Sequence, residues 1–201
     1  GQISAKAEDS FWNGIKTGST SATIAALTAD TTTQERSWAA GKTEGALNDG
    51  VVAKLITNHV RSYVSGTTLT SANIATEFGK LYADMDANLL DAFEAPVIYA
   101  PKAVKQLINI YNSNATYRDL FAKEGEKMFY NGIEIRFVPL DANIMILTLP
   151  SYVIWCTDLL SDLNYLQIEK IAANRDDMFI KAVFTLDAHV VNQKYFSLYV
   201  G

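Results

Sequence analysis

The spacing of apolar residues changes part-way along this chain from a helical period to a strand-like one. Between positions 51 and 111, apolar residues recur at steps of three and four, which is the spacing of one face of an α-helix. From Lys127 onward they tend to alternate with polar residues, as in residues 133–137, which is typical of a strand with one buried face. The sequence therefore predicts an α+β fold, with helices in the first half and a largely antiparallel sheet in the second.

Four helices are predicted before the change. The first covers residues 2–15, ends at Asn13-Gly14 and has Phe11 and Trp12 as apolar anchors. The other three cover residues 51–64, 74–93 and 101–111, with Pro101 in the first turn of the last. Residues 17–33 are rich in Thr, Ser and Ala and predict a loop or a short hairpin.

The strands are predicted around turn signals. Asn131-Gly132 takes positive φ readily at both central positions of a primed turn, so residues 128–130 and 133–137 are expected to form a hairpin. Residues 96–100 predict a short buried strand, and the polar residues 112–125 predict a loop. The further strands expected are 143–149, 152–157, 165–171, 178–191 and 195–200.

Composition excludes several classes of protein. The 201 residues are 49% hydrophobic and 19% charged, which predicts a folded body of one large or two small domains. A net charge of -5 with scattered Lys and Arg argues against specific nucleic-acid binding. No apolar run approaches the ~20 residues of a bilayer span, and the first residues lack the apolar stretch of a signal peptide. We expect no membrane association.

The cysteine and the histidines predict no reactive or metal site. Cys156 lies in the apolar stretch 152–156 without a neighbour that would lower its pKa, so a buried structural thiol is expected. A single cysteine also fits a reducing compartment. We expect His59 on a polar helix face and His189 packed in a strand, too few ligands for a zinc site of His and Cys.

The remaining polar motifs favour structural roles over catalysis. Gly41-Lys42-Thr43 resembles the end of a phosphate-binding loop, but Arg36 stands where that loop requires Gly. Three acidic pairs are expected to be solvated or to cap turns: Asp84/Asp86, Asp158/Asp162 and Asp176/Asp177. We therefore expect no catalytic residues, no cofactor and no metal, and a protein that is not an enzyme.

The order of features in residues 70–201 resembles the major capsid proteins of tailed phages, which share the Hong Kong 97-type shell fold. A helix leads into a short strand and Ala100-Pro101-Lys102, and the next helix ends near Tyr111. After a polar loop, residues 130–135 (Tyr-Asn-Gly-Ile-Glu-Ile) match the place where the family has a Gly followed by alternating apolar residues, and Val138-Pro139-Leu140 follows.

The later strands continue this resemblance. A strand at 144–147 and a second strand that runs into residues 157–163 come next. Residues 167–169 and a long strand at 179–189 then resemble the sheet of the family's peripheral domain. The specificity lies in the ordered set rather than in one motif, and the opening helix with residues 11–14 resembles the family more weakly.

The resemblance implies a division of the chain. Residues 1–49 would be a partial peripheral domain (the end of the spine helix and a loop), 50–157 the axial domain, 158–194 the peripheral strands and 195–201 a return strand. The family's N-terminal arm and extended loop would be missing, and Gly1 in place of Met fits such a truncation.

The resemblance also implies a function. The chain would be a structural protein that self-assembles into pentamers and hexamers of an icosahedral shell, in the host cytoplasm first and in the virion capsid afterwards. Its partners would be copies of itself, with scaffolding protein and portal as further ones. Residues 112–125 would form the tip of the axial domain, near the five- and six-fold axes. Subunit contacts are expected there at Asn112, Asn114, Tyr117, Arg118 and Asp119.

Two other functions stay open from the sequence. An encapsulin-type nanocompartment shell shares the fold and packages cargo enzymes. A hydrolase or transferase would need carboxylates that converge only in three dimensions, in a deep pocket with perturbed pKa values. A thin molecule with flat lateral faces would count against the enzyme.

Overall fold

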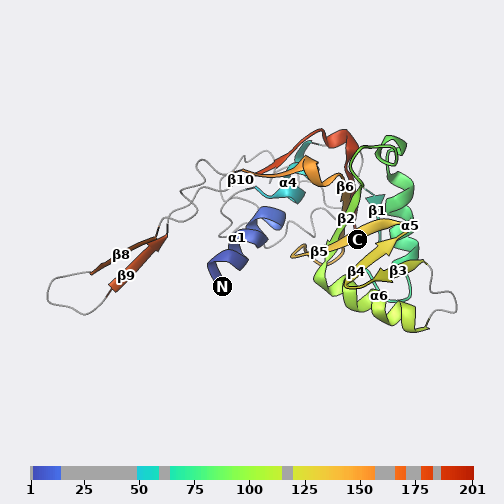
Figure 1. The fold of residues 1–201 in the computed structure, drawn as a ribbon, viewed down its shortest axis with the longest axis horizontal. Helices are drawn as coiled ribbons and strands as arrows, with labels where there is room; N and C mark the ends of the chain where they lie inside the picture. The colour runs from blue at the N-terminus through green and yellow to red at the C-terminus, as the bar shows by residue number, and fades with distance from the viewer. Residues whose placement is uncertain are drawn as a thin grey trace.

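The largest element of the protein is a seven-stranded, mainly antiparallel sheet with the strand order β1-β11-β6-β2-β5-β4-β3 (Figure 1). The computed structural model describes residues 2–14, 49–58, 64–114, 120–156, 166–170, 178–182 and 187–201. Two further sheets have two strands each, β10-β7 and β8-β9. The fold is therefore mixed α+β, as the change in apolar spacing predicts.

The helices and strands have the following bounds. The helices are α1 (Gln2–Asn13), α4 (Val51–Asn58), α5 (Ile74–Asp84) and α6 (Lys102–Asn114), with 3₁₀ turns η1 (Ala87–Leu89), η2 (Pro150–Tyr152) and η4 (Gln193–Tyr195). The strands of the large sheet are β1 (Val64–Ser65), β2 (Val97–Pro101), β3 (Phe121–Glu124), β4 (Lys127–Tyr130), β5 (Ile133–Val138), β6 (Ile144–Thr148) and β11 (Ser197–Val200). The small sheets are made of β7 (Val153–Cys156), β8 (Leu166–Lys170), β9 (Met178–Ala182) and β10 (Asp187–Val190).

Helices cover both faces of the large sheet. Successive side chains of a strand point to opposite faces, and β2 shows this directly. Val97 and Tyr99 pack into a core cluster with α1 and α4, whereas Ile98 and Ala100 pack into a second cluster with α5 and α6. Since both faces of β2 are covered, its whole length is buried. This explains why the sequence shows a short continuous apolar run there rather than alternation.

The hairpin predicted at Asn131-Gly132 is confirmed. Tyr130 pairs with Ile133 across the turn, and Asn131 and Gly132 have φ values of 47° and 82°. Positive φ at both central positions is the backbone of a type I′ turn, whose twist matches that of the flanking strands. The turn therefore sets the register in which Met128 and Ile135 face the same core.

The helix predicted over residues 74–93 is shorter than its apolar pattern. α5 ends at Asp84 because Met85 takes an extended conformation with φ -59° and ψ 135°. The Asp86 side chain then accepts a hydrogen bond of 3.0 Å from the backbone N–H of Asn88, which starts the separate turn η1. Leu90 and Phe93, expected on the buried face, are exposed.

Two other boundaries differ from the prediction. Val64, expected in the helix that begins at Val51, lies in β1 and pairs with Tyr199. Pro101 ends β2, where it pairs with Val138, and the helix begins one residue later. The sequence shows the apolar residues but not the partner strands that decide these ends.

The loop predicted at residues 112–125 is also partly wrong. α6 continues through Asn114, and Phe121 begins the edge strand β3. Phe121 is buried, with its ring 5.2 Å from the rings of both Phe78 and Tyr130. The burial of this one aromatic side chain thus stabilises the pairing of an otherwise polar segment with the sheet.

The strand predicted over residues 178–191 includes two strands in different sheets. β9 pairs with β8 over Met178–Ala182, whereas β10 pairs with β7 over Asp187–Val190. In Figure 1 the β8–β9 pair lies apart from the rest of the ribbon, beyond the β7–β10 pair. The predicted segment 17–33 lies outside the described residues.

Candidate functional site

The described surface carries a few large apolar side chains that no described element covers. They lie in three places: residues 84–94, helix α6 and strand β7. Exposed apolar side chains that form a contiguous patch rimmed by polar residues mark surfaces that contact other molecules, whereas single ones are common on protein surfaces.

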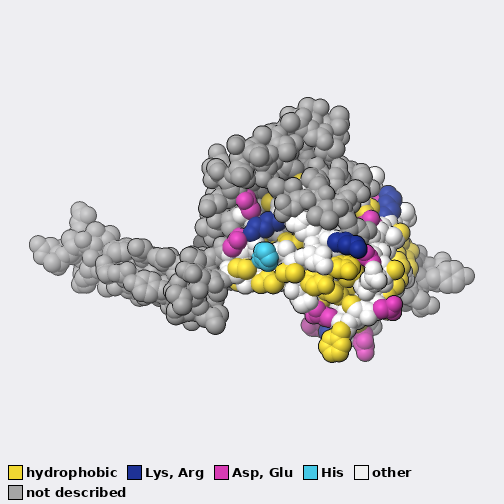
Figure 2. All heavy atoms as spheres, turned by 90° about the horizontal axis from the view of Figure 1, so that it is seen from above, with side chains coloured by type: hydrophobic (Ala, Val, Ile, Leu, Met, Phe, Trp, Pro, Cys, Tyr) yellow, Lys and Arg dark blue, Asp and Glu magenta, His cyan; other side chains and the backbone are white. Residues whose placement is uncertain are grey.

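The segment 84–94 combines exposed apolar and acidic side chains. Leu90 is 54% exposed and Phe93 is fully exposed. The segment contains the carboxylates of Asp84, Asp86, Asp91 and Glu94 and no basic residue. Glu94 anchors its far end by accepting a hydrogen bond of 3.2 Å from the backbone N–H of Ser151. Figure 2 shows hydrophobic and acidic side chains side by side on the described surface.

Helix α6 presents a row of exposed residues at every fourth position. The α6 row consists of Lys102, Gln106, Ile110 and Asn114, which lie one above the other along the helix surface. Ile110 is 47% exposed, although Ile108, two positions before it, is fully buried. The helix contains Lys102 and Lys105 and no acidic residue, so its exposed side is basic.

Strand β7 exposes its own apolar residues. Trp155 is 42% exposed, and its ring stacks on Phe11 of α1 with ring centroids 4.6 Å apart. Ile154 is 39% exposed and lies opposite His189 in the β7–β10 pair. The prediction that His189 is packed is wrong, because its side of β10 faces away from the core.

Cys156 shares that outer face of the β7–β10 pair. The thiol is half-buried, so the prediction of a buried thiol is wrong. Cys156 lies opposite the exposed Asp187, whose carboxylate forms a salt bridge of 2.8 Å with Lys54 of α4. The sequence shows an apolar strand there but not that only one of its faces meets the core.

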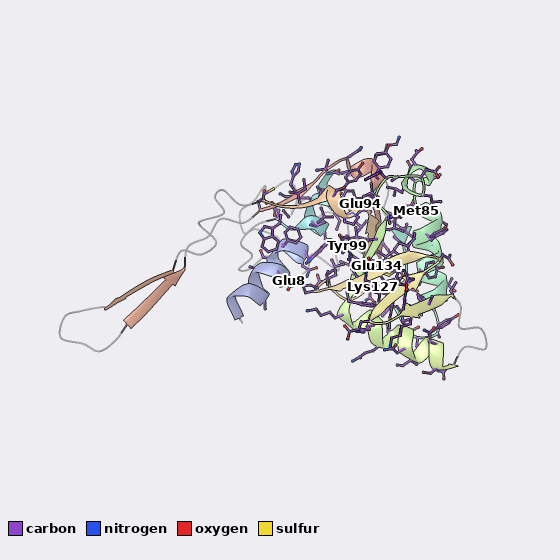
Figure 3. The ribbon with its side chains drawn as sticks, viewed as in Figure 1. Glu8, Met85, Glu94, Tyr99, Lys127 and Glu134 are labelled. Atoms are coloured by element: carbon purple, nitrogen blue, oxygen red, sulfur yellow. The ribbon has the colours of Figure 1, made fainter. Side chains whose placement is uncertain are left out.

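A ladder of charged side chains crosses strands β4 and β5 beside Tyr99 (Figure 3). Glu134 lies 3.2 Å from Lys127 and 3.2 Å from Arg136. Burial raises the pKa of Glu134, but hydrogen bonds from Lys127 and Arg136 outweigh burial, and the pKa stays below its ordinary value. Burial raises the pKa of Tyr99, although Arg136 opposes the shift.

This ladder is suited to holding strands together rather than to proton transfer. A general acid or base works best when its pKa lies near the working pH. Both pKa values move away from this range, because the pKa of Glu134 is lowered and the pKa of Tyr99 is raised. The carboxylate therefore stays charged and the phenol stays neutral near pH 7. Within the part of the chain that the structure describes, no three His, Cys, Asp or Glu residues come together as a metal site.

The expected subunit contacts divide between described and undescribed residues. Asn112 is half-buried, and its side-chain amide donates a hydrogen bond of 3.3 Å to the carbonyl of Phe121. Asn114 is exposed at the end of α6. Tyr117, Arg118 and Asp119 lie outside the described residues. The structure therefore brings Asn112 to an internal bond between α6 and β3 and leaves Asn114 on the surface.

The acidic pairs, His59 and the Gly41-Lys42-Thr43 motif are also divided between described and undescribed residues. Asp86 caps η1, as expected of an acidic residue beside a turn. Asp84 is half-buried at the end of α5. The residues that lie outside the described part of the chain are His59, Gly41-Lys42-Thr43, Asp158, Asp162, Asp176 and Asp177. None of the described helices has the length and the apolar character needed to cross a membrane.

The sequence does not predict that the apolar residues of segment 84–94 are exposed. Leu90 and Phe93 continue the three- and four-residue steps of α5, which is why they were assigned to its buried face. The signal that could have separated them is the density of acidic residues around them, since four carboxylates in eleven residues are difficult to place along a buried face.

No protein-family model matches the sequence, and the search among curated proteins finds no match.

Proposed function

We propose that this chain is a structural subunit of a viral shell, the major capsid protein of a tailed phage or prophage with the Hong Kong 97-type fold. Under this proposal the large sheet with α5 and α6 is the axial domain, and the end of α6 is its tip. The β8–β9 pair belongs to the peripheral domain. The chain assembles with copies of itself into pentamers and hexamers, with scaffolding protein and portal as further partners.

The observation that carries the proposal is the β8–β9 pair. Each strand has five residues, and the pair lies apart from the rest of the described ribbon (Figure 1). A two-stranded ribbon on its own is only marginally stable in water, because it cannot bury its apolar side chains. Such an arm is stabilised when it lies on the surface of a neighbouring molecule, and a shell places a neighbour on every side.

The distribution of exposed apolar residues supports the same function. Phe93 lies between α5 and β2, Ile110 on α6 and Trp155 on β7, so three separate parts of the fold carry them. An enzyme that acts alone needs one concave site, whereas a shell subunit needs several contact surfaces at once. The carboxylate of Glu134, whose pKa lies below its ordinary value, is not poised to act as a general acid near pH 7.

Electron microscopy of the full product of the gene, expressed without other viral proteins, tests the proposal. We expect closed particles, or rings with five- and six-fold symmetry if a scaffolding protein is needed for closure. A species that stays small and monodisperse at every concentration would contradict a shell protein. Size-exclusion chromatography with light scattering on the same sample measures this directly.

A further inference from the structure

We infer that residues 64–73 form a strap that opens and closes as one unit at the edge of the large sheet, with the hydroxyl of Tyr199 as its latch. The strap consists of β1 and the turn that leads into α5. When the strap opens, β11 loses its partner along this edge, and an unpaired edge can pair with a strand of another chain. The inference does not depend on the proposed function.

The first reason is that the strap contributes little to the core. β1 has two residues and lies at the end of the strand order, where its neighbour is β11. Among the strap side chains that the structure describes, Leu69 is buried in the core shared with α5. The exposed residues of the strap are Thr67, Thr68, Thr70 and Ala72. A segment with few buried apolar side chains opens at a lower free-energy cost than the core.

The second reason is that the strap holds its own shape. The side-chain amide of Asn73 donates to the carbonyl of Thr68 at 2.9 Å, and its Oδ1 accepts from the backbone N–H of Thr70 at 2.7 Å. Backbone N–H groups then tie the strap to other elements, through hydrogen bonds from Gly66 to the carbonyl of Val200 (2.9 Å), from Thr67 to the hydroxyl of Tyr199 (3.0 Å) and from Leu69 to Oδ1 of Asn143 (2.8 Å). Because the internal bonds persist when the outer ones break, the strap moves as a unit.

The third reason is that the latch has one proton and two acceptors. The hydroxyl of Tyr199 lies 2.7 Å from Oε2 of Glu77 and 2.8 Å from the carbonyl oxygen of Thr67. A carboxylate is the stronger acceptor, and Lys80, 2.9 Å from Glu77, favours its charged form. The phenol proton therefore goes to Glu77, so Thr67 is held to the hydroxyl by its N–H and not by its carbonyl.

Amide hydrogen exchange followed by NMR on the full chain tests the strap. We expect the amides of Gly66, Thr67 and Leu69 to share one protection factor, at least about tenfold below that of the β2 and β6 amides. Low concentrations of urea should hardly change it, because opening the strap exposes little surface. Three different protection factors would overturn the single unit, and protection equal to that of β6 would overturn local opening.

Tyr199→Phe tests the latch. The substitution removes the acceptor of the Thr67 amide and leaves the acceptors of Gly66 and Leu69 in place. If the strap opens as a unit, all three amides should exchange faster by the same factor, about tenfold for one lost hydrogen bond. Tyr195→Phe, on a half-buried ring, is the matched control and should leave them unchanged. Faster exchange at Thr67 alone would overturn the unit.

Glu77→Gln tests the competition for the phenol proton. A neutral amide accepts more weakly than a carboxylate, so the proton becomes available to the carbonyl of Thr67. We expect exchange of the strap amides to slow by roughly threefold or more, although the fold as a whole loses stability. Asp91→Asn at an exposed position is the control and should change neither quantity. Strap amides that exchange faster in Glu77→Gln, as those of β6 do, would overturn Tyr199 as a latch that Glu77 weakens.

Discussion

The hydroxyl of Tyr199 lies 2.7 Å from Oε2 of Glu77, and both side chains are buried. This contact ties the last strand, β11, to helix α5, which covers it. Lys80 Nζ also donates to both carboxylate oxygens of Glu77, at 2.9 and 3.0 Å. The backbone N–H of Thr67 donates to the Tyr199 hydroxyl at 3.0 Å, so the phenol is both donor and acceptor.

Tyr199→Phe should destabilise the fold without changing its shape. The substitution keeps the ring but removes a hydrogen bond from a buried carboxylate, and such a loss costs about 1–3 kcal/mol. Urea denaturation followed by circular dichroism measures the free energy of unfolding. Tyr195→Phe is the control, because it removes the same group from a half-buried ring. Equal effects of the two substitutions would show that the bond to Glu77 contributes nothing.

The free energy of unfolding should fall at acidic pH because Glu77 becomes protonated. Burial raises the pKa of this carboxyl, but the hydrogen bonds from Tyr199 and Lys80 outweigh burial and hold the pKa below its ordinary 4.5. A pKa that is lower in the folded state means that the carboxylate contributes its full stability above about pH 4.5. This contribution is lost as the pH falls through the lower folded value.

Glu77→Gln isolates this effect. The variant should be less stable than the parent at pH 7, and it should lose less stability on further acidification, because the group that takes up the proton is gone. Urea denaturation at a series of pH values between about 7 and 3 gives both quantities. Asp91→Asn at an exposed position should keep the parent's pH dependence. A variant as steeply pH-dependent as the parent would exclude Glu77 as the responsible group.

Replacing either of two glycines by alanine should change the stability of the fold, in opposite directions for Gly66 and Gly79. A Cβ on Gly66 would lie 2.0 Å from the ring and the hydroxyl of Tyr199, so Gly66→Ala must displace that side chain. We expect a loss of about 1–3 kcal/mol or more. A Cβ on Gly79 in α5 would meet only the hydroxyl of Tyr130, at 3.5 Å, so Gly79→Ala should gain about 0.5–1 kcal/mol from helix propensity. Melting temperatures that shift in the same direction would contradict this packing.

The β4–β5 turn should be sensitive to its second residue. Gly132 has a φ of 82°, and Gly132→Ala should cost about 1 kcal/mol or more because a Cβ disfavours this region. Asn131→Asp is the control, since Asp also tolerates the φ of 47° at the first position. Chemical denaturation compares the two variants. A neutral Gly132→Ala would mean that the turn relaxes to another type.

Helices and turns that depend on near neighbours were predictable. The conformation of the Asn131-Gly132 turn depends on two adjacent residues, so the sequence predicts its position correctly. The short apolar run at residues 96–100 also predicted a buried strand, and β2 is buried along its whole length. The candidate contact surfaces were predicted less well, because exposure depends on which elements lie nearby. Phe93 follows the helical spacing but is fully exposed, and Cys156 lies in an apolar strand but is only half-buried.

The amino-acid order alone determined the α+β composition and the positions of most elements, because apolar spacing and turn chemistry act over a few residues. Only the tertiary structure decided where α5 ends, that Phe121 starts an edge strand and that Glu77 meets Tyr199. These outcomes depend on partners distant in the chain, 122 positions apart for Glu77 and Tyr199. Local pattern carries no information about such partners, and their packing and hydrogen bonds exist only once the sheet has formed.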